Sequence, residues 1–329
     1  MIHFVLNSHG LGFEKYSMLC VKSLRAVCGA GPRVSVFCPD NVAPPPPIAL
    51  DFYARHGVEV LSFHNELLPA RLGDLGAVPA RHLTFNKVYA MQGIAPGERR
   101  VFLDADIVFL KDPCPYFESI SEASGASPVN TPEAFGGDWG ALYDAVGVPF
   151  PKSRVEVWTR YVYGDAPEPE KVSIPPYFSS GVVYATAAST VPDLWLRMCR
   201  ELEGRLPLVP RTFFIDQIAL SVALEQTARP YRVLPRAFNT TYEIWRFTPD
   251  CALFHYVGFD ALAAAIARFP EVARAVRPVV KDLAREDGLD LRLGLLTEIP
   301  RLYRRSLGIL ARTTEQVLGF RLPTAKERT

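Results

Sequence analysis

Two aspartates interrupt an apolar run in the first third of the chain. Residues 101–113 read VFLDADIVFLKDP, and Asp104 and Asp106 are separated by one residue. Side chains at i and i+2 of a regular strand point to the same face, so the spacing predicts two carboxylates side by side, about 6 to 7 Å apart along the strand. Such a pair suits a hard divalent cation, Mg²⁺ or Mn²⁺, that also binds water and phosphate oxygens. In the plainer interpretation of a lone DxD, one aspartate caps the strand and the other is solvated.

Strand-like and helix-like segments alternate up to and beyond this motif. Apolar β-rich runs predict strands over 2–6, 33–39, 58–63, 99–110, 176–186, 231–235 and 251–258. Helical spacing of apolar residues predicts helices over 16–27, 48–57, 83–94, 190–206 and 213–226. This alternation predicts a largely parallel sheet covered by helices on both faces, whose strand ends face a ligand crevice.

Two segments depart from the regular alternation. Residues 113–176 are rich in Pro, Gly, Ser and aromatic residues, with a weak helical pattern over 152–164, which predicts a long excursion over the sheet. From residue 261 onward the pattern is mainly helical. We therefore expect one large domain over 1–260 and a helical C-terminal extension over 261–329.

Composition excludes several classes of protein. The chain has 329 residues, is 49% hydrophobic and carries a formal net charge of +1, which is typical of a globular protein and gives no global field for nucleic acid. The six cysteines show no CxxC pair and no zinc-type spacing, so they predict neither a disulfide framework nor a structural metal site. No signal peptide or apolar span is evident, and we expect a cytoplasmic protein.

The C-terminal segment is basic. From Arg292 to the end, eight Arg and Lys residues stand against three Glu residues. Apolar residues over 302–310 are interleaved with four of the arginines, which are Arg301, Arg304, Arg305 and Arg312. This pattern fits an amphipathic helix on the anionic inner face of a membrane, as a peripheral contact, or a solvated packing helix, and both interpretations stay open.

Short motifs recur in a characteristic order from residue 2 to about residue 260. They read IHFVLN, YSMLCVKSL, FNKVYAM, VFLDADIVFLKD, YFSSGVVYA, IDQIAL, LPRAFN and FHYVG. In this order they resemble the glycosyltransferase family 8 group of the GT-A fold, nucleotide-sugar transferases, and in particular the retaining lipooligosaccharide galactosyltransferases. The resemblance implies a mixed α/β sheet flanked by helices, a nucleotide-sugar donor with UDP favoured, and a saccharide or lipid-linked acceptor.

The resemblance also implies a metal centre. Asp104 and Asp106 match the family's metal-binding DxD, and His255 matches its third metal ligand. An imidazole beside two carboxylates favours Mn²⁺ over Mg²⁺. Standing alone, His255 would fit a core histidine at a strand end.

Other matched positions are implied to bind or act on the donor. Lys87 matches a basic residue that contacts the donor diphosphate or sugar, where Lys gives a point charge rather than a bidentate fork. Asp216 and Gln217 match a DQ pair beneath the sugar ring, with Gln217 facing the anomeric carbon. Both could instead be polar positions of an amphipathic helix, and Lys87 a solvated helix lysine. The remaining donor-binding positions are Asn7, Ser8, Ala105, Ser179, Ser180, Gly181, Asn239 and Gly258.

Several positions differ from the family pattern. Ser179 replaces an Asn that contacts the donor sugar, and the usual acidic residue of the base-binding loop is absent near Asn7. Ala261 stands where a lysine that touches the leaving phosphate is expected. Arg236, Arg246 and Lys281 are candidate replacements for that lysine.

Two other functions stay open at this point. VFLDADIV also fits the nucleophile motif of a haloacid dehalogenase-type phosphatase, with Asp104 as the nucleophile, although that motif normally closes the first strand. The loss at Ala261 equally allows a catalytically weak sugar-nucleotide binding protein. The favoured prediction is a metal-dependent glycosyltransferase that acts with retention of configuration.

Overall fold

The computed structural model places a mixed sheet at the centre of the molecule. It describes residues 1–9, 12–41, 44–68, 80–95, 97–121, 123–131, 137–161, 167–209, 212–227, 229–289 and 291. The sheet has seven strands in the order β10-β6-β9-β4-β1-β2-β3. Their bounds in chain order are β1 Ile2–Asn7, β2 Arg33–Pro39, β3 Glu59–Phe63, β4 Arg99–Leu103, β6 Gly125–Pro128, β9 Phe178–Ala185 and β10 Arg232–Val233.

Strand direction makes the sheet mixed. β1 pairs in parallel with β2 and β4, and β2 pairs in parallel with β3. β9 runs antiparallel to both β4 and β6, while β10 runs parallel to β6. The expected mixed α/β sheet is confirmed, and the reversed β9 brings its N-terminal residues to the edge where β1 and β4 end.

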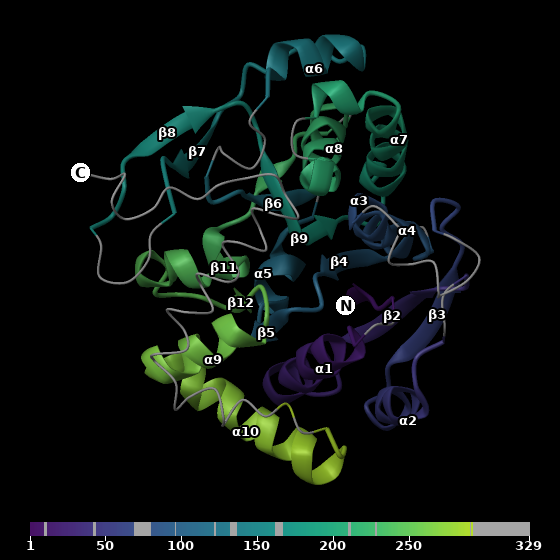
Figure 1. Ribbon diagram of the computed structural model, residues 1–329, viewed down its shortest axis with the longest axis vertical. Coiled ribbons are helices and arrows are strands. Elements are labelled where there is room, and N and C mark those ends of the chain that lie inside the picture. The colour runs from purple at the N-terminus through teal and green to yellow at the C-terminus, as the bar shows by residue number, and fades with distance from the viewer. Residues whose placement is uncertain are drawn as a thin grey trace.

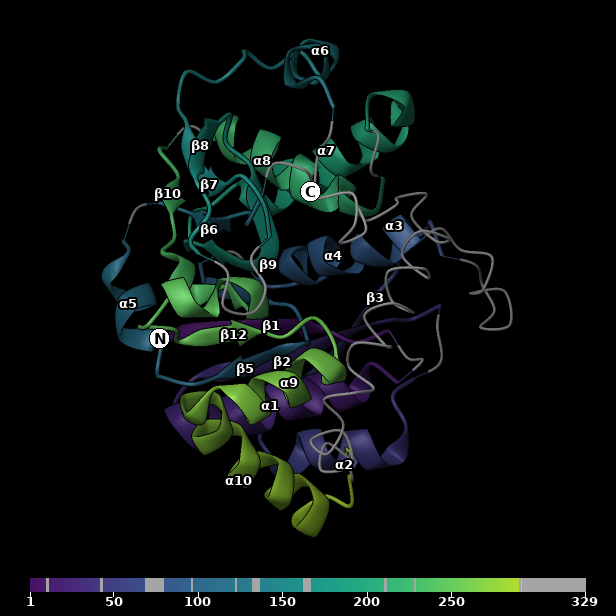
Figure 2. The same ribbon diagram turned by 60° about the vertical axis from the view of Figure 1, so that its left-hand side comes forward.

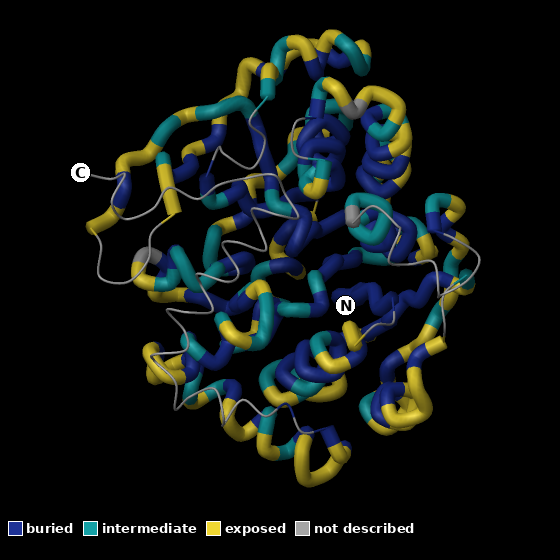
Figure 3. The backbone as a smooth tube through the Cα atoms, in the orientation of Figure 1, coloured by how far each residue is buried: buried dark blue, intermediate teal, exposed yellow. Residues whose placement is uncertain are grey.

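Helices cover both faces of this sheet (Figures 1 and 2). In β1, Phe4 and Leu6 belong to the apolar cluster on one face and Val5 to the cluster on the other, as strand geometry requires. The first face is covered by α1 Glu14–Cys28, α2 Pro47–Arg55, α9 Phe259–Arg268 and α10 Pro270–Glu286. The second is covered by α4 Asn86–Gln92, α7 Val191–Glu203 and α8 Ile215–Glu225. Helix α3 Ala80–Thr84 contacts α4 and α8, and α6 Trp139–Ala145 contributes Leu142 and Tyr143 to the same apolar cluster. Figure 3 shows the central strands mostly buried and the outer helix faces exposed.

Smaller elements complete the fold. A second sheet has the strand order β11-β12-β5, and β7 pairs with β8 as an antiparallel ribbon. The bounds are β5 Ile107–Phe109, α5 Cys114–Ser119, β7 Val155–Trp158, β8 Lys171–Ile174, β11 Thr240–Thr241 and β12 Leu253–His255. Short 3₁₀ helices span Leu206–Leu208, Thr212–Phe214, Arg236–Phe238 and Tyr242–Phe247.

Three sequence-based expectations about elements are wrong. The single strand over 99–110 is two strands, β4 and β5, which belong to different sheets. The helical pattern over 152–164 contains β7, a strand stabilised by pairing with the next strand, β8. The segment over 113–176 is more than an excursion, because it contributes β6 to the central sheet. In each case pairing with another strand outweighs the local pattern.

The expected helix over 83–94 is present with one interruption. Phe85 separates α3 from α4, although its own backbone stays in the right-handed helical region with φ −68° and ψ −21°. Helix α2 ends as predicted before Gly57, whose φ of 59° lies in the left-handed region.

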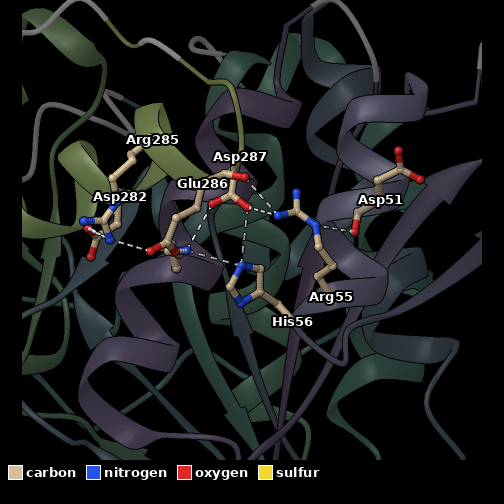
Figure 4. A network of polar contacts seen from close by, with 8 residues as sticks. Asp51, Arg55, His56, Asp282, Arg285, Glu286 and Asp287 are labelled. Carbon is tan, nitrogen blue, oxygen red and sulfur yellow. Dashed lines mark hydrogen bonds and ion pairs between the residues drawn. The ribbon is translucent and has the colours of Figure 1, made fainter.

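A buried carboxylate holds the end of α10 against α1 and α2 (Figure 4). The side chain of Asp287 is fully buried, and it lies 3.0 Å from Nζ of Lys22 and 2.7 Å from Nη1 of Arg55. Lys22 also lies 2.9 Å from Glu286. Residues of α9 and α10 also belong to the apolar cluster on the first face of the central sheet. The division of the chain into two parts at residue 260 stays a prediction.

Two observations concern membranes. Among the residues that the structure describes, no helix is both long enough and apolar enough to cross a bilayer. The basic helix predicted around Arg301 to Arg312 lies outside the described residues.

Candidate active site

The ends of three neighbouring strands meet at one edge of the central sheet. Leu6 of β1 pairs with Leu103 of β4, so Asn7 and Asp104 lie at adjacent strand ends. Leu103 also pairs with Val182 of the antiparallel β9, which puts Gly181 beside Asp104. The backbone N–H of Asp104 donates to the carbonyl of Gly181 at 2.8 Å. Sheet register alone therefore gathers these residues.

The two aspartates lie in a turn, which corrects the expectation of a regular strand. After Asp104 the chain leaves the central sheet, turns through Ala105 and Asp106, and enters β5 of the second sheet. There Ile107 pairs with His255 of β12, and the N–H of Tyr256 donates to the carbonyl of Asp106 at 3.0 Å. The carboxylates of Asp104 and Asp106 and the imidazole of His255 therefore lie close together at the junction between the two sheets.

These three side chains form a ligand set for a divalent cation. One ligand atom each from Asp104, Asp106 and His255 lies within 4.8 Å of the others. Nε2 of His255 is 3.1 Å from Oδ1 of Asp106 and 3.9 Å from Oδ2 of Asp104. Two carboxylate oxygens and one imidazole nitrogen match the donor preferences of Mn²⁺, so the residues fit the expected metal.

Asn239 fixes the orientation of the His255 ring. Its side-chain Oδ1 lies 3.0 Å from Nδ1 of His255, and an amide oxygen can only accept, so Nδ1 carries the proton. When the ring is neutral, Nε2 is therefore the nitrogen that is free to bind an ion on the side of the aspartates. This is how a metal-ligating histidine is usually held by its other nitrogen.

Gly181 leaves room for this ring. A Cβ built on Gly181 would lie 2.8 Å from Cε1 and Nδ1 of His255 and 3.3 Å from Oδ2 of Asp104. The resemblance implied a donor-binding position for Gly181, and in the structure a side chain at this position would meet two of the candidate metal ligands. Any larger residue would displace the imidazole.

Lys87 links the aspartate turn to α8. Its Nζ lies 3.0 Å from Oδ1 of Asp104 and 3.1 Å from Oδ2 of Asp216, and it donates to Oγ of Ser180 at 3.0 Å. Ser180 in turn donates to Asp216 at 2.5 Å. An ammonium group has three N–H donors, so those of Lys87 are all engaged here.

Burial and charge act against each other in this cluster. Burial would lower the pKa of Lys87, but Asp104 and Asp216 outweigh it and raise the pKa. Burial raises the pKa of Asp104, whereas His255 outweighs burial at Asp106 and lowers the pKa of that carboxyl. Three carboxylates against one ammonium leave two negative charges when His255 is neutral, and a divalent cation would balance them.

Three predicted residues lie next to the cluster without joining its polar contacts. Gln217 follows Asp216 on α8 and is partly exposed. Ser179 points to the opposite side of β9 from Ser180, and its hydroxyl accepts from the N–H of Gly181 at 3.3 Å. Ala105 is buried within the turn between the two aspartates.

The loop after β1 carries unpartnered polar atoms. Asn7 and Ser8 are buried, and Oγ of Ser8 has no hydrogen-bond partner among the described residues. His9 is also buried; its Nδ1 lies 3.4 Å from the amide of Asn7, whereas its Nε2 has no partner there. Buried polar atoms normally have partners, so the loop is suited to receive a polar ligand.

His9 follows Asn7 and Ser8 in the segment that the resemblance assigns to binding of the base. Burial, assisted by the charge of Lys87, lowers the pKa of His9 to about 4, which keeps the imidazole neutral near pH 7. Its burial depends on the fold, including contact between its ring and that of Phe13 at 3.8 Å between centroids.

The turn after β12 is strained. Val257 has a φ of 51°, which is unfavourable for a β-branched residue, and its side chain is exposed. Gly258 follows with a φ of 115°, a value that only glycine adopts readily. The resemblance implied a donor-binding role for Gly258, and the structure shows a conformational requirement for glycine at that position.

Of the three candidate replacements for the lysine expected at Ala261, Arg236 is already engaged by other groups. The guanidinium of Arg236 donates to the carbonyls of Val129 and Glu156 at 3.1 and 2.8 Å and lies over the ring of Trp158. Lys281 is an exposed residue of α10, and Arg246 belongs to a short 3₁₀ helix.

Comparison with known proteins identifies the family to which this chain belongs. The Rhodobacterales glycosyltransferase domain matches residues 2–228. The fold is similar to that of galactosyltransferase LgtC in complex with donor and acceptor sugar analogues, at 14% identity and a TM-score of 0.52, covering 93% of this chain and 99% of that one. An active-site mutant of LgtC matches at 15% identity and a TM-score of 0.53, covering 87% and 100%.

No curated protein sequence matches the chain. The structural matches confirm the GT-A fold that the motif order implied. The family match distinguishes between the enzyme classes that the DxD motif left open and selects the transferase over the phosphatase. The chain belongs to the Rhodobacterales glycosyltransferase family and is a GT-A glycosyltransferase.

Proposed function

We propose that this glycosyltransferase moves a sugar from a nucleotide diphosphate donor, with a UDP-sugar favoured, to a saccharide or lipid-linked acceptor. The reaction depends on Mn²⁺ or Mg²⁺ and retains the anomeric configuration. The observation that carries the proposal is the convergence of Asp104, Asp106 and His255 within 4.8 Å at the end of β4. Asp104, Asp106 and His255 would hold the ion, which would offset negative charge on the donor diphosphate.

The remaining residues of the cluster would position the donor. Lys87 holds Asp104 and Asp216 in fixed places, because a single ammonium contacts both carboxylates. Asp216 would accept hydrogen bonds from sugar hydroxyls with the oxygen that Lys87 and Ser180 leave free. Gln217, on the next position of α8, would face the anomeric carbon.

The loop after β1 would receive the base. Asn7 can both donate to and accept from a uracil edge, and Oγ of Ser8 is a further unpartnered group. Such groups lose water on folding without gaining a partner, so a base that satisfies them would bind more tightly than one that does not. Gly258 and Asn239 would border the diphosphate from the side of β12.

The most direct test measures UDP release from a panel of UDP-sugars with and without Mn²⁺. We expect hydrolysis or transfer with at least one donor, strict dependence on the ion, and loss of activity in Asp106→Asn. The matched control is Asp250→Asn, since the Asp250 side chain is 91% exposed and contacts only Lys111 among the described ion pairs. A protein that binds UDP-sugars with Mn²⁺ but never releases UDP would be a binding protein, and phosphate release without sugar transfer would favour a phosphatase.

The acceptor, the stereochemistry of the transfer and the cellular compartment of the protein are each tested by a separate measurement. A lipid-linked acceptor would suit a basic segment such as residues 301–312, and flotation with anionic vesicles would test this contact. The anomeric configuration of the product, read by NMR, would test retention. The six cysteines are free, which fits the reducing cytoplasm.

A further inference from the structure

A second group of metal-binding side chains lies outside the candidate active site. Cys28 is the last residue of α1, which ends there because Gly29 adopts a φ of 64°. Asp112 lies in the loop after β5, and Cys114 is the first residue of α5. The sequence spacing of the cysteines gave no metal-site pattern, because the ligands come from elements far apart in the chain.

The three side chains already face one another. One ligand atom from each of Cys28, Asp112 and Cys114 lies within 4.8 Å of the other two. The thiol of Cys28 donates to Oδ1 of Asp112 at 3.3 Å, and the backbone N–H of Cys114 donates to the same oxygen at 2.9 Å. In a tetrahedral zinc site with Zn–S bonds of about 2.3 Å, ligand atoms lie roughly 3.8 Å apart, so only a small inward movement is needed.

The donor set selects a class of ion. Two sulfurs and one carboxylate oxygen suit a borderline-soft tetrahedral cation such as Zn²⁺, rather than Mg²⁺. Cys28 and Cys114 are partly exposed and Asp112 is exposed, so an ion can enter and a water can fill the fourth position. This ligand set shares no residue with Asp104, Asp106 and His255.

We propose that Cys28, Asp112 and Cys114 form a second metal site for a zinc-type ion. Binding forms two metal–thiolate bonds and one metal–carboxylate bond and releases the two thiol protons to solvent, with no change of oxidation state. The inference does not rest on the proposed glycosyl transfer.

The carboxylate favours metal binding over a disulfide. A disulfide would join only the two sulfur atoms and would leave Asp112 without a role. A tetrahedral ion needs further ligands besides the two sulfurs, and Asp112 supplies one of them. Once both thiols have lost their protons to metal binding, the three ligands carry three negative charges, of which a divalent cation offsets two. The structure holds Asp112 by the N–H of Cys114, which keeps the carboxylate beside both sulfurs.

The site would brace the junction that leads to the active site. Helix α1 already contacts β5, where the N–H of Phe109 donates to the buried hydroxyl of Ser23 at 3.1 Å. β5 follows Asp106 directly, and Asp112 comes three residues after β5 ends. An ion bridging Cys28 to Asp112 and Cys114 would fix the far end of this segment to α1.

Cobalt titration of the full chain under reducing conditions tests the proposal. Thiolate ligands give Co²⁺ an intense charge-transfer absorption, which the sulfur-free set at Asp104, Asp106 and His255 cannot produce. We expect the band to appear in the wild type, and to saturate at one equivalent of Co²⁺ in Asp106→Asn, which lacks one ligand of the other metal site. We expect it to vanish in Cys28→Ser and Cys114→Ser, and binding to weaken by about tenfold or more in Asp112→Asn, where a neutral amide replaces the anionic ligand.

A thermal melt with Zn²⁺ supplies an independent readout. Zn²⁺ should raise the Tm of the wild type and of Asp106→Asn but not of Cys114→Ser, because an ion that binds only the folded state stabilises it. The proposal is overturned if no charge-transfer band appears, or if the band survives in the Cys28→Ser/Cys114→Ser double variant. It is equally overturned if mass spectrometry of the purified protein shows a Cys28–Cys114 disulfide that forms in the presence of excess Zn²⁺.

Discussion

Lys87 on α4 and Asp216 on α8 form a buried ion pair, with 3.1 Å between Nζ and Oδ2. The same ammonium lies 3.0 Å from Asp104, so it connects a helix to the turn that carries the candidate metal ligands. A lysine at this position therefore has a structural role whether or not it touches a donor phosphate.

Removal of Lys87 should destabilise the protein strongly. Lys87→Met leaves Asp104 and Asp216 as buried carboxylates without a cation, which typically costs about 3 to 5 kcal/mol. Urea denaturation of the metal-free protein measures the loss. Lys87→Met/Asp216→Asn should recover part of it, because one of the uncompensated charges is gone. A double variant that is no more stable than Lys87→Met would show that the charge pairing is unimportant.

Gly181→Ala should weaken both metal binding and folding. The new Cβ would meet the His255 ring at 2.8 Å, so the imidazole must rotate or shift. We expect at least a tenfold rise in the Kd for Mn²⁺, measured by calorimetry. Overpacking costs roughly 1 to 3 kcal/mol of stability. Gly31→Ala is the matched control, because nothing lies within 4 Å of a Cβ at that position. Equal Mn²⁺ affinities in the two variants would refute the role of Gly181.

Asn239→Leu should reduce Mn²⁺ affinity by about 10- to 100-fold, since His255 loses the acceptor that fixes its tautomer. Asn239→Asp keeps an acceptor at this place and should retain more of the affinity. Calorimetric titration of both variants decides the matter. An unchanged Kd in Asn239→Leu would mean that the ring is held by packing alone.

His9 should make the protein sensitive to mild acid. Burial lowers the pKa of His9 to about 4 in the folded state, against 6.5 for an ordinary histidine. The unfolded chain therefore binds more protons between these values, and stability falls as the pH drops from about 6.5 to about 4. A shift of this size corresponds to about 3 kcal/mol.

The comparison with His9→Gln isolates this contribution, because other histidines titrate in both proteins. The free energy of unfolding of the wild type should fall by about 3 kcal/mol more than that of the variant between pH 7 and pH 4. Parallel pH profiles of the two proteins would show that His9 is accessible to protons in the folded state.

Local patterns of apolar residues and glycine predicted much of the fold. Apolar runs located β1, β2, β3 and β9, and helical spacing located α1, α7 and α8, because these elements bury residues with a regular period. Glycine marked the end of α2 through the left-handed φ of Gly57. The prediction failed for β7 and for the split between β4 and β5, where pairing with other strands decides the conformation.

The candidate site shows the same division. Asp104, Asp106 and His255 were predicted from motif order, and the structure brings them within 4.8 Å. That Lys87 pairs with Asp216 and that Asn239 orients His255 could not be read from the sequence. The sequence also did not predict that Cys28 and Cys114 lie close together, since no spacing rule covers ligands from separate elements.

The sequence by itself determined which groups can do chemistry and which segments form the main strands and helices, because residue type and hydrophobic period are local properties. Only the tertiary structure decided the distances and protonation among those groups. After Leu103 the chain passes from the central sheet into the second sheet, which turns Asp106 toward His255. Burial raises the pKa of Asp104, although the charge of Lys87 opposes this shift. Both effects depend on contacts between residues that are remote in the chain, and local pattern carries no information about them.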